Sequence, residues 1–220
     1  FQQEPRFRPS SLVPPRVAAG LFGRKTGQGW YAYERDARQV PPTPPVPALP
    51  AGLEVWVAPK ATECDALKAL VEAAGARWVE RPTPEALLIV QPWGGDATGE
   101  AVALGLDAAR CVAIDPLPGL GRHRTLMLTA ATAPAMRDAA HALCAHDGVG
   151  VTVINDSPGF IVQRVLATVV NIAAQIAQRG IASVDDIEDA VKLGLGYPQG
   201  PLSWGDRIGG AQVLAILFAG

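Results

Sequence analysis

The sequence predicts an α/β domain with a degenerate, Rossmann-like and mainly parallel sheet, followed by an all-α domain. Between residues 51 and 155 short apolar runs alternate with segments of helical periodicity, as in parallel strands covered by helices on both faces. From Asp156 onward the periodicity is helical only. The 220 residues are 49% hydrophobic and 18% charged, enough length and apolar character to bury a core.

The first fifty residues are set apart by proline. Six prolines stand between Val40 and Ala51, and proline fixes φ and lacks an N–H donor, so residues 41–50 are predicted to be a stiff, extended linker. Residues 1–40 are therefore a separate unit, with a short helix expected within 10–19 and a turn rich in glycine and aromatic residues over 20–33. Forty residues cannot build a core alone.

The Rossmann-like domain is expected over 51–154. Its first helix carries Leu67, Leu70, Val71 and Ala74 on one face, and its last helix has Pro134 in the first turn, where proline is tolerated. The predicted strands cover 53–58, 76–80, 86–91, 111–115, 125–129 and 149–155, and the predicted helices cover 61–74, 98–106 and 134–146.

The helical domain is expected over 155–220. Asp156 and Ser157 are cap residues and Pro158 suits the first helical position, which together predict a helix over 158–179. Its broad apolar stripe requires a partner surface. A second helix is predicted from Ser183, because Ser183 and Asp186 have the spacing of a capping box.

Charge and cysteine content exclude several classes of protein. With 19 basic and 21 acidic residues the chain has no bulk basic field for nucleic acid or an anionic membrane. Cys64, Cys111 and Cys144 form no spaced pair, which favours a reducing, cytoplasmic setting. No leader or membrane-spanning run is evident. Both ends of the chain are expected to be truncation points within a longer polypeptide.

The turn after the first predicted strand lacks the residues of a dinucleotide site. A pyrophosphate normally approaches a helix N-terminus through a glycine-rich turn. Here the turn is Ala58-Pro59-Lys60-Ala61, without glycine, and it continues to the acidic Glu63. The sequence therefore predicts no usual NAD site in this domain.

Candidate polar clusters are few. The glycine-rich segment around Arg24 and Lys25 has the composition of an anion-binding nest, which could hold a phosphate of a nucleotide or of coenzyme A. The alternative interpretation is a structural turn whose aromatic residues pack into a helical core. His141, Cys144 and His146 gather near one helix end but have no recognised ligand spacing, so no metal site is predicted. The acidic residues within 185–189 are expected to interact favourably with the helix dipole and to be exposed to water.

Two groups of segments resemble one family. Residues 23–33, preceded by 7–11, resemble the tail of the C-terminal helical domain of NAD-dependent 3-hydroxyacyl-CoA dehydrogenases. Residues 155–164, with 185–187 and 192–202, resemble the start of that same domain. The resemblance implies the C-terminal part of a tandem-repeat bacterial enzyme, similar to those of phenylacetate breakdown or of 3-hydroxybutyryl-CoA metabolism. Residues 1–40 then end one helical domain, and 51–154 and 155–220 belong to a second copy.

The resemblance also carries expectations about the site. The family's histidine base falls on Val112, its glutamate partner falls near Met127, and the asparagine of its Pro-Gly-Phe-Ile-Val-Asn-Arg segment is replaced by Gln163. Valine cannot transfer a proton, so no catalytic residue is expected in this copy. The whole enzyme is expected to oxidise the 3-hydroxyl of an acyl-CoA with NAD, as an oxidoreductase of fatty acid metabolism, while this part binds no cofactor. Candidate substrate contacts are Arg24, Lys25 and Gln163.

The expected role of this part is structural. The resemblance implies a homodimer in which the helix over 158–179 is a main interface element, so that aspartate at Val169 or Val170 is expected to break the dimer. Residues 1–33 are expected to dock onto the helical domain, either within their own chain or on a neighbouring one. Two alternatives stay open: a stand-alone dimerisation or CoA-binding module, and another Rossmann-plus-helical dehydrogenase acting on hydroxy acids.

Overall fold

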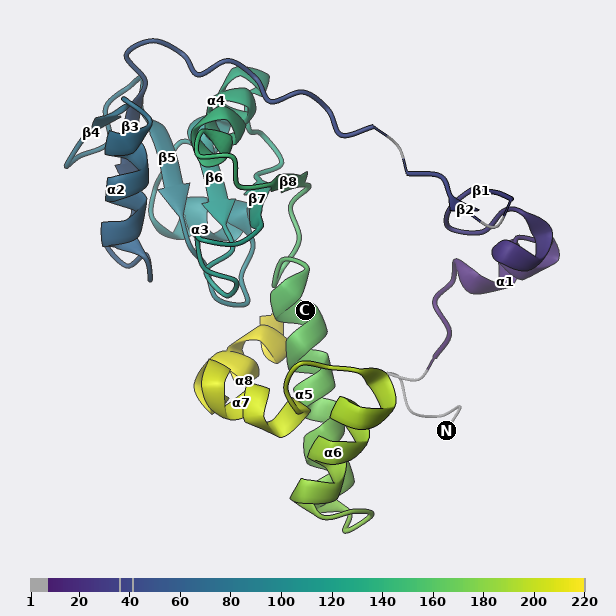
Figure 1. Cartoon of the computed structure of the whole chain (residues 1–220). Coiled ribbons are helices and arrows are strands. Elements are labelled where there is room, and N and C mark those ends of the chain that lie inside the picture. The colour runs from purple at the N-terminus through teal and green to yellow at the C-terminus, as the bar shows by residue number, and fades with distance from the viewer. Residues whose placement is uncertain (1–7, 36, 41, 220) are drawn as a thin grey trace. The chain divides into compact units, whose positions relative to one another are not determined.

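The computed structural model describes residues 8–35, 37–40 and 42–219, and the chain forms two compact units, Phe1–Pro45 and Val46–Gly220 (Figure 1). The division falls inside the proline-rich segment 41–50. In the first unit α1 (Val13–Ala18) lies within the range predicted for a short helix. It is followed by the single turn η2 (Arg24–Thr26) and by the antiparallel pair β1 (Tyr33–Glu34) and β2 (Ala37–Arg38).

None of the described residues of the first unit is buried. Cations lie over its aromatic rings instead: the guanidinium of Arg16 is 4.0 Å from the centre of the Trp30 ring, and that of Arg38 is 4.4 Å from the centre of the Tyr31 ring. The side chain of Trp30 is 67% exposed. Such stacking adds modest stability at exposed sites, and the described residues of this unit form no apolar core.

The second unit contains a six-stranded sheet in the order β4-β3-β5-β6-β7-β8. The strands β3 to β6 are parallel, β7 runs antiparallel to β6, and β8 runs parallel to β7. The turn from β6 to β7 contains no helix, and a strand that returns without a crossover must run antiparallel. The six strands are β3 (Glu54–Val57), β4 (Arg77–Trp78), β5 (Leu87–Val90), β6 (Cys111–Ile114), β7 (Arg124–Leu128) and β8 (Val151–Ile154).

Helices cover both faces of this sheet (Figure 1). Helices α2 (Cys64–Ala73) and α4 (Pro134–Ala145) pack on one face, where Leu67 and Leu143 meet alternate strand residues such as Val55. Helix α3 (Ala97–Ala103) packs on the other face with Trp56 and Phe160. The α/β class, the Rossmann-like arrangement and the three helices are thus as the sequence predicts, with ends that differ by a few residues.

The helical domain contains α5 (Val162–Gln178), α6 (Val184–Leu195), α7 (Pro201–Ile208) and α8 (Gly210–Ala219). The prediction that a helix begins at Pro158 is wrong: α5 begins four residues later. Gly159 has φ +74° and Phe160 has φ +48°, conformations that a right-handed helix excludes. Phe160 is only 2% exposed and packs on the sheet, so tertiary packing holds this turn.

The apolar stripe of α5 packs within the chain. Ala167 and Val170 on α5 form a core with Val213 and Ile216 on α8, and Gly205 on α7 leaves room for Val170. Val170 is therefore an interior residue of this domain. The Val170→Asp variant would destabilise the fold itself, so its association state would not test the dimer interface.

Two acidic or hydroxyl side chains cap the later helices. The Ser183 hydroxyl accepts a hydrogen bond from the Asp186 N–H, which confirms the predicted cap of α6. The Glu188 carboxylate accepts hydrogen bonds from the N–H groups of Leu202 and Ser203 at the start of α7. Gly200 leaves room for the Glu188 carboxylate, which a Cβ at this position would displace. Among the described residues, no helix has both the length and the apolar character needed to cross a bilayer.

Candidate functional site

The strand order reverses between β3 and β5, because the chain places β4 on one side of β3 and β5 on the other. In open α/β sheets ligands bind in the crevice outside the carboxyl ends of the strands at such a point. Four polar side chains gather at these strand ends, and we call them the edge cluster: Glu63, Gln91, Asp115 and Gln163.

Glu63 and Gln91 close the crevice between β3 and β5. The side-chain oxygen of Gln91 accepts from the Glu63 N–H at 2.9 Å, and the Gln91 side-chain nitrogen donates to Glu63 Oε2 at 3.0 Å. Glu63 Oε1 accepts from the Leu120 N–H in the turn after β6. Glu63 directly precedes α2, so its carboxylate lies where a helix N-terminus attracts an anion.

Gln163, in the first turn of α5, joins the helical domain to the sheet. Its side chain is fully buried, its oxygen accepts from the Gly94 N–H at 2.8 Å, and its nitrogen donates to the Pro92 carbonyl and to Asp115 Oδ1. All polar atoms of this amide are therefore engaged within the chain, and the residue is a structural link between the two domains.

Asp115 is the least satisfied member of the edge cluster. Its Oδ1 accepts from Gln163 and from the Leu117 N–H, whereas its buried Oδ2 has no hydrogen-bond partner among the described residues. Burial raises the pKa of this carboxyl above its ordinary value, the two hydrogen bonds oppose that change, and the charge of Glu63 reinforces it.

The turn after β3 does not fit a dinucleotide in the usual manner. Ala58 is buried and its N–H donates to the Ile89 carbonyl, and Pro59 has no N–H to offer. The Ala61 N–H donates to the Ala58 carbonyl. Lys60 is exposed, Glu63 lies in the crevice, and the turn lacks the glycine backbone that a pyrophosphate requires.

Val112 and Met127 both lie inside the sheet domain. Val112 is fully buried in the middle of β6, on the face covered by α2 and α4. Met127 is fully buried on the opposite face, where its sulfur accepts a hydrogen bond from the Ser157 N–H at 3.2 Å. Neither position offers a group that transfers protons, and neither reaches the surface.

The remaining candidate residues are dispersed. Arg24 and Lys25 lie in η2 of the first unit, between Gly23 and Gly27, which both have positive φ. Cys144 is buried, and burial raises its pKa to about 12, while His146 Nδ1 lies 3.1 Å from the Leu143 carbonyl oxygen. Within the described residues no three His, Cys, Asp or Glu side chains are placed together to hold a metal ion.

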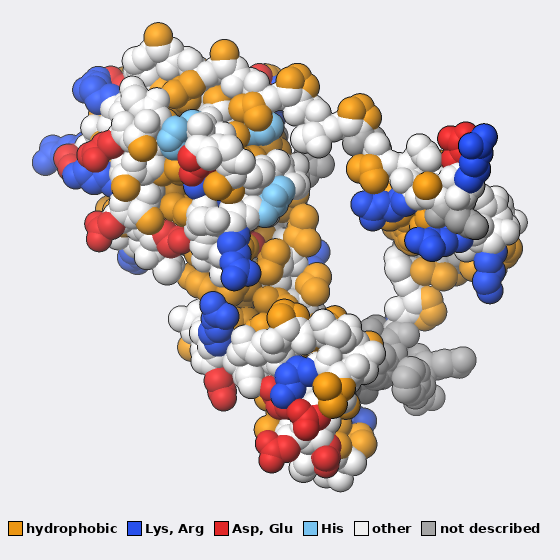
Figure 2. Space-filling model, viewed as in Figure 1, with side chains coloured by type: hydrophobic (Ala, Val, Ile, Leu, Met, Phe, Trp, Pro, Cys, Tyr) orange, Lys and Arg blue, Asp and Glu red, His pale blue; other side chains and the backbone are white. Residues whose placement is uncertain are grey.

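A cleft of about 530 Å³ opens where the sheet domain meets the helical domain, and we call it the interdomain cleft. Figure 2 shows hydrophobic and basic side chains where these two domains meet. The sequence did not single out this site, because its walls come from segments far apart in the chain. The sheet domain contributes Trp93, Leu117, Pro118 and Arg122, and the helical domain contributes Val162, Leu166, Pro198, Trp204, Arg207 and Ile208.

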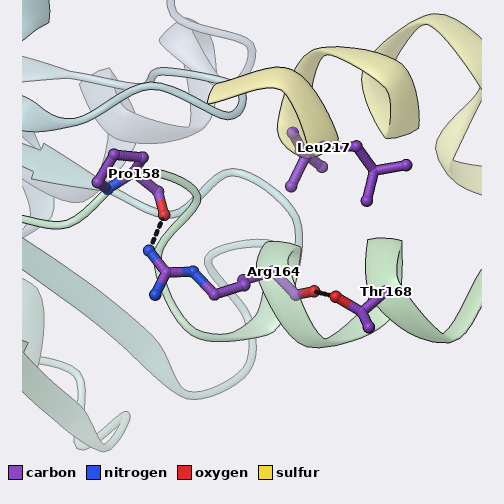
Figure 3. Close-up of a pocket in the computed structure, with 5 residues that line it drawn as sticks. Pro158, Arg164, Thr168 and Leu217 are labelled. Atoms are coloured by element: carbon purple, nitrogen blue, oxygen red, sulfur yellow. Dashed lines mark hydrogen bonds between the residues drawn. The ribbon is translucent and has the colours of Figure 1, made fainter. Parts of the chain in front are cut away.

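A second hollow of about 390 Å³ lies between α5 and α8 (Figure 3). Its one charged side chain, Arg164, donates to the Ser157 hydroxyl and to the Pro158 carbonyl, and the Thr168 hydroxyl donates to the Arg164 carbonyl at 2.8 Å. Ile216 and Leu217 form the opposite wall. Arg164 is thus engaged within the chain, and this hollow has the composition of a packing gap.

A Rossmann-like sheet joined through Gln163 to a bundle of helices defines a two-domain protein of the α/β-plus-helical class. Residues 159–218 match the family model of the C-terminal domain of 3-hydroxyacyl-CoA dehydrogenases. The helical domain of this chain therefore resembles the C-terminal domain of that family.

Relatives extend this match over the whole chain. The Escherichia coli K12 3-hydroxyadipyl-CoA dehydrogenase is 30% identical over 99% of the chain, which spans 41% of that protein. A 3-hydroxybutyryl-CoA dehydrogenase from Clostridioides difficile is 47% identical over 29% of the chain and 23% of its own length. The crystal structure of a 3-hydroxybutyryl-CoA dehydrogenase from Escherichia coli K12 superposes with a TM-score of 0.71 and 26% identity, covering all of this chain and 41% of the other.

Proposed function

We propose that the chain is the C-terminal part of an NAD-dependent 3-hydroxyacyl-CoA dehydrogenase, an oxidoreductase of fatty acid metabolism that converts the 3-hydroxyl of an acyl-CoA to a 3-oxo group. The observation that carries this proposal is the match over the whole chain to a protein named for that reaction, of which the chain spans 41%. The acyl-CoA substrate and the NAD cofactor belong to the whole enzyme. The three free cysteines support the expectation of a reducing, cytoplasmic setting.

Within that enzyme we infer that the present sheet domain is a non-catalytic copy. Hydride transfer to NAD needs a bound dinucleotide and a base for the hydroxyl proton. Buried Val112 stands at the position assigned to the family's base, the position of the base's partner falls near buried Met127, and Glu63 and Gln91 bond to each other in the crevice. These arrangements support a structural role for the copy.

Titration of the 220-residue chain with NADH, followed by calorimetry, tests this inference. We expect no heat of binding, and the same result for the Lys60→Ala variant, in which the one cation of the turn is removed. Saturable binding at micromolar NADH that is weakened in Lys60→Ala would contradict the inference, because it would mean that the turn holds a pyrophosphate without glycine.

We also propose that the helical domain contributes to a homodimer interface. Exposed apolar side chains support this, since Leu193 and Leu195 on α6 and Phe218 on α8 are at least two-thirds exposed. In sedimentation experiments Leu193→Asp is expected to favour the monomer, whereas Val102→Asp, on the similarly exposed surface of α3, is expected to leave the association state unchanged. If Leu193→Asp sediments like the parent chain, α6 is not the interface.

A further inference from the structure

Asp115, the residue after β6, lies where the helical domain meets the sheet domain. It is 2% exposed, and the side-chain nitrogen of Gln163 on α5 donates to its Oδ1 at 2.9 Å. The Gln163 amide is itself fully buried and also bonds to the Gly94 N–H and to the Pro92 carbonyl, both after β5. One buried carboxyl and one buried amide thus hold α5 against the ends of two central strands.

An ionised Asp115 has no compensating charge at this position. Its Oδ2 is buried without a hydrogen-bond partner among the described residues, and the carboxylate of Glu63 adds a like charge. The guanidinium groups of Arg122, Arg124 and Arg164 belong to neighbouring segments, but over the part of the chain that the structure describes none of them donates to Asp115. A buried carboxyl in such surroundings is stabilised by protonation or by hydration.

Hydration of Oδ2 requires α5 to move away from the strand ends, because the buried Gln163 lies over the carboxyl. The protonated carboxyl carries no charge and keeps its hydrogen bond from Gln163, so it is compatible with burial. Burial, reinforced by the charge of Glu63, raises the pKa of Asp115 and so extends the pH range over which the carboxyl stays protonated.

We propose that Asp115 is a proton-dependent switch between the two domains: the protonated carboxyl keeps α5 against the strand ends, and ionisation releases α5 while the sheet stays folded. The chemical step is the loss of one proton from the carboxyl oxygen to solvent. Contact between the domains is therefore strongest in acid and weakens as the pH rises through the pKa of Asp115 in the folded chain. This switch goes beyond the proposed function and does not depend on it, since no step involves a dinucleotide or an acyl-CoA.

Amide hydrogen exchange of the whole chain, followed by NMR, tests the switch. The Gly94 N–H donates to Gln163 across the domain contact, whereas the Ala58 N–H donates to the Ile89 carbonyl inside the sheet. Both exchange rates are measured at pH 5 and pH 8, over urea concentrations below the unfolding transition, and are compared with the intrinsic rate at each pH. The urea dependence of each rate reports the surface exposed in the corresponding opening.

At pH 8 we expect Gly94 to exchange through an opening with a smaller urea dependence than that of Ala58, because α5 is released without unfolding of the sheet. The protection factor of Gly94 is expected to fall by at least about fivefold from pH 5 to pH 8.

Variants assign this fall to one carboxyl. Asp115→Asn keeps the shape of the protonated side chain and cannot ionise, so the fall is expected to disappear. Asp65→Asn, at an exposed position on α2, is expected to behave like the parent chain. Asp115→Ser also removes the titratable group and takes the place of Asp115→Asn if that variant does not fold.

Two results would overturn the proposal. One is an equal urea dependence for Gly94 and Ala58 at pH 8, since α5 then leaves the strand ends only when the sheet unfolds. The other is a protection factor of Gly94 that does not fall with pH in the parent chain, or that falls equally in a folded variant without a carboxyl at position 115.

Discussion

Gly94, in the turn after β5, lies against the backbone of Ala215 in α8, so closely that a Cβ on Gly94 would stand 2.7 Å from the Ala215 carbonyl oxygen. The same glycine has φ +75° and donates its N–H to Gln163. The contact between the sheet domain and the helical domain therefore depends on a residue without a side chain.

Gly94→Ala is expected to lower the free energy of unfolding by roughly 2–3 kcal/mol, because the new methyl group meets backbone atoms in a left-handed conformation. Urea unfolding measures the loss. Gly105→Ala is the matched control: Gly105 has φ +63° but open space around it, so only the conformational cost of about 1 kcal/mol applies. An equal decrease in the free energy of unfolding of the two variants would show that the contact of Gly94 with α8 does not contribute to stability.

Gln163→Leu is expected to destabilise the chain by roughly 2–4 kcal/mol, since it keeps the volume of the side chain but leaves the Gly94 N–H and the Asp115 carboxylate short of partners. The control is Gln178→Leu, at the exposed end of the same helix, where little change is expected. A parent-like urea midpoint for Gln163→Leu would mean that Gln163 does not link the two domains.

Asp115 makes stability depend on pH above the acid range. The pKa of Asp115 is raised in the folded chain. The protonated carboxyl therefore contributes fully to the free energy of unfolding below the ordinary aspartate pKa of about 4, and this contribution is lost as the pH rises through the pKa of the folded chain. Asp115→Asn removes this dependence, and the stability of the variant relative to the parent should increase from pH 4 to pH 8. The exposed Asp65→Asn serves as control, and a constant difference across this range would contradict the assignment.

Asp147 makes stability depend on pH in the opposite sense. Hydrogen bonds from the buried guanidinium of Arg124 lower its pKa to about 2, against the effect of burial. The stabilising contribution is present above about pH 4 and is lost as the pH falls toward 2.

Asp147→Asn is expected to cost roughly 1–2 kcal/mol at pH 7, the lower part of the range for charged hydrogen bonds, because the carboxylate is partly exposed. Urea unfolding at pH 7 and pH 3 measures the cost, which should shrink at the lower pH. Asp138→Asn, which removes the exposed partner of Arg137, should change stability little at either pH. A cost that stays constant between the two pH values would contradict the role of the ionised Asp147.

The sequence by itself determined the class of fold, most element positions and the cap at Ser183, because these follow from local periodicity, proline and short-range hydrogen bonds. It also indicated the resemblance of residues 155–202 to the C-terminal domain of 3-hydroxyacyl-CoA dehydrogenases, and the absence of glycine from the turn at 58–61. Phe160 illustrates where local signals fail: Pro158 suits a helix start, yet burial of the phenylalanine on the sheet holds φ positive and delays α5.

Only the tertiary structure decided how distant segments combine. The antiparallel β7 depends on the path of the turn after β6, and the edge cluster depends on α5 returning Gln163 to strand ends some 48 to 71 residues earlier in the chain. The interdomain cleft likewise joins Trp93 to Trp204 and Arg122 to Arg207. Such contacts depend on packing across large sequence separations, whereas periodicity and capping report only on neighbours within a few residues along the chain.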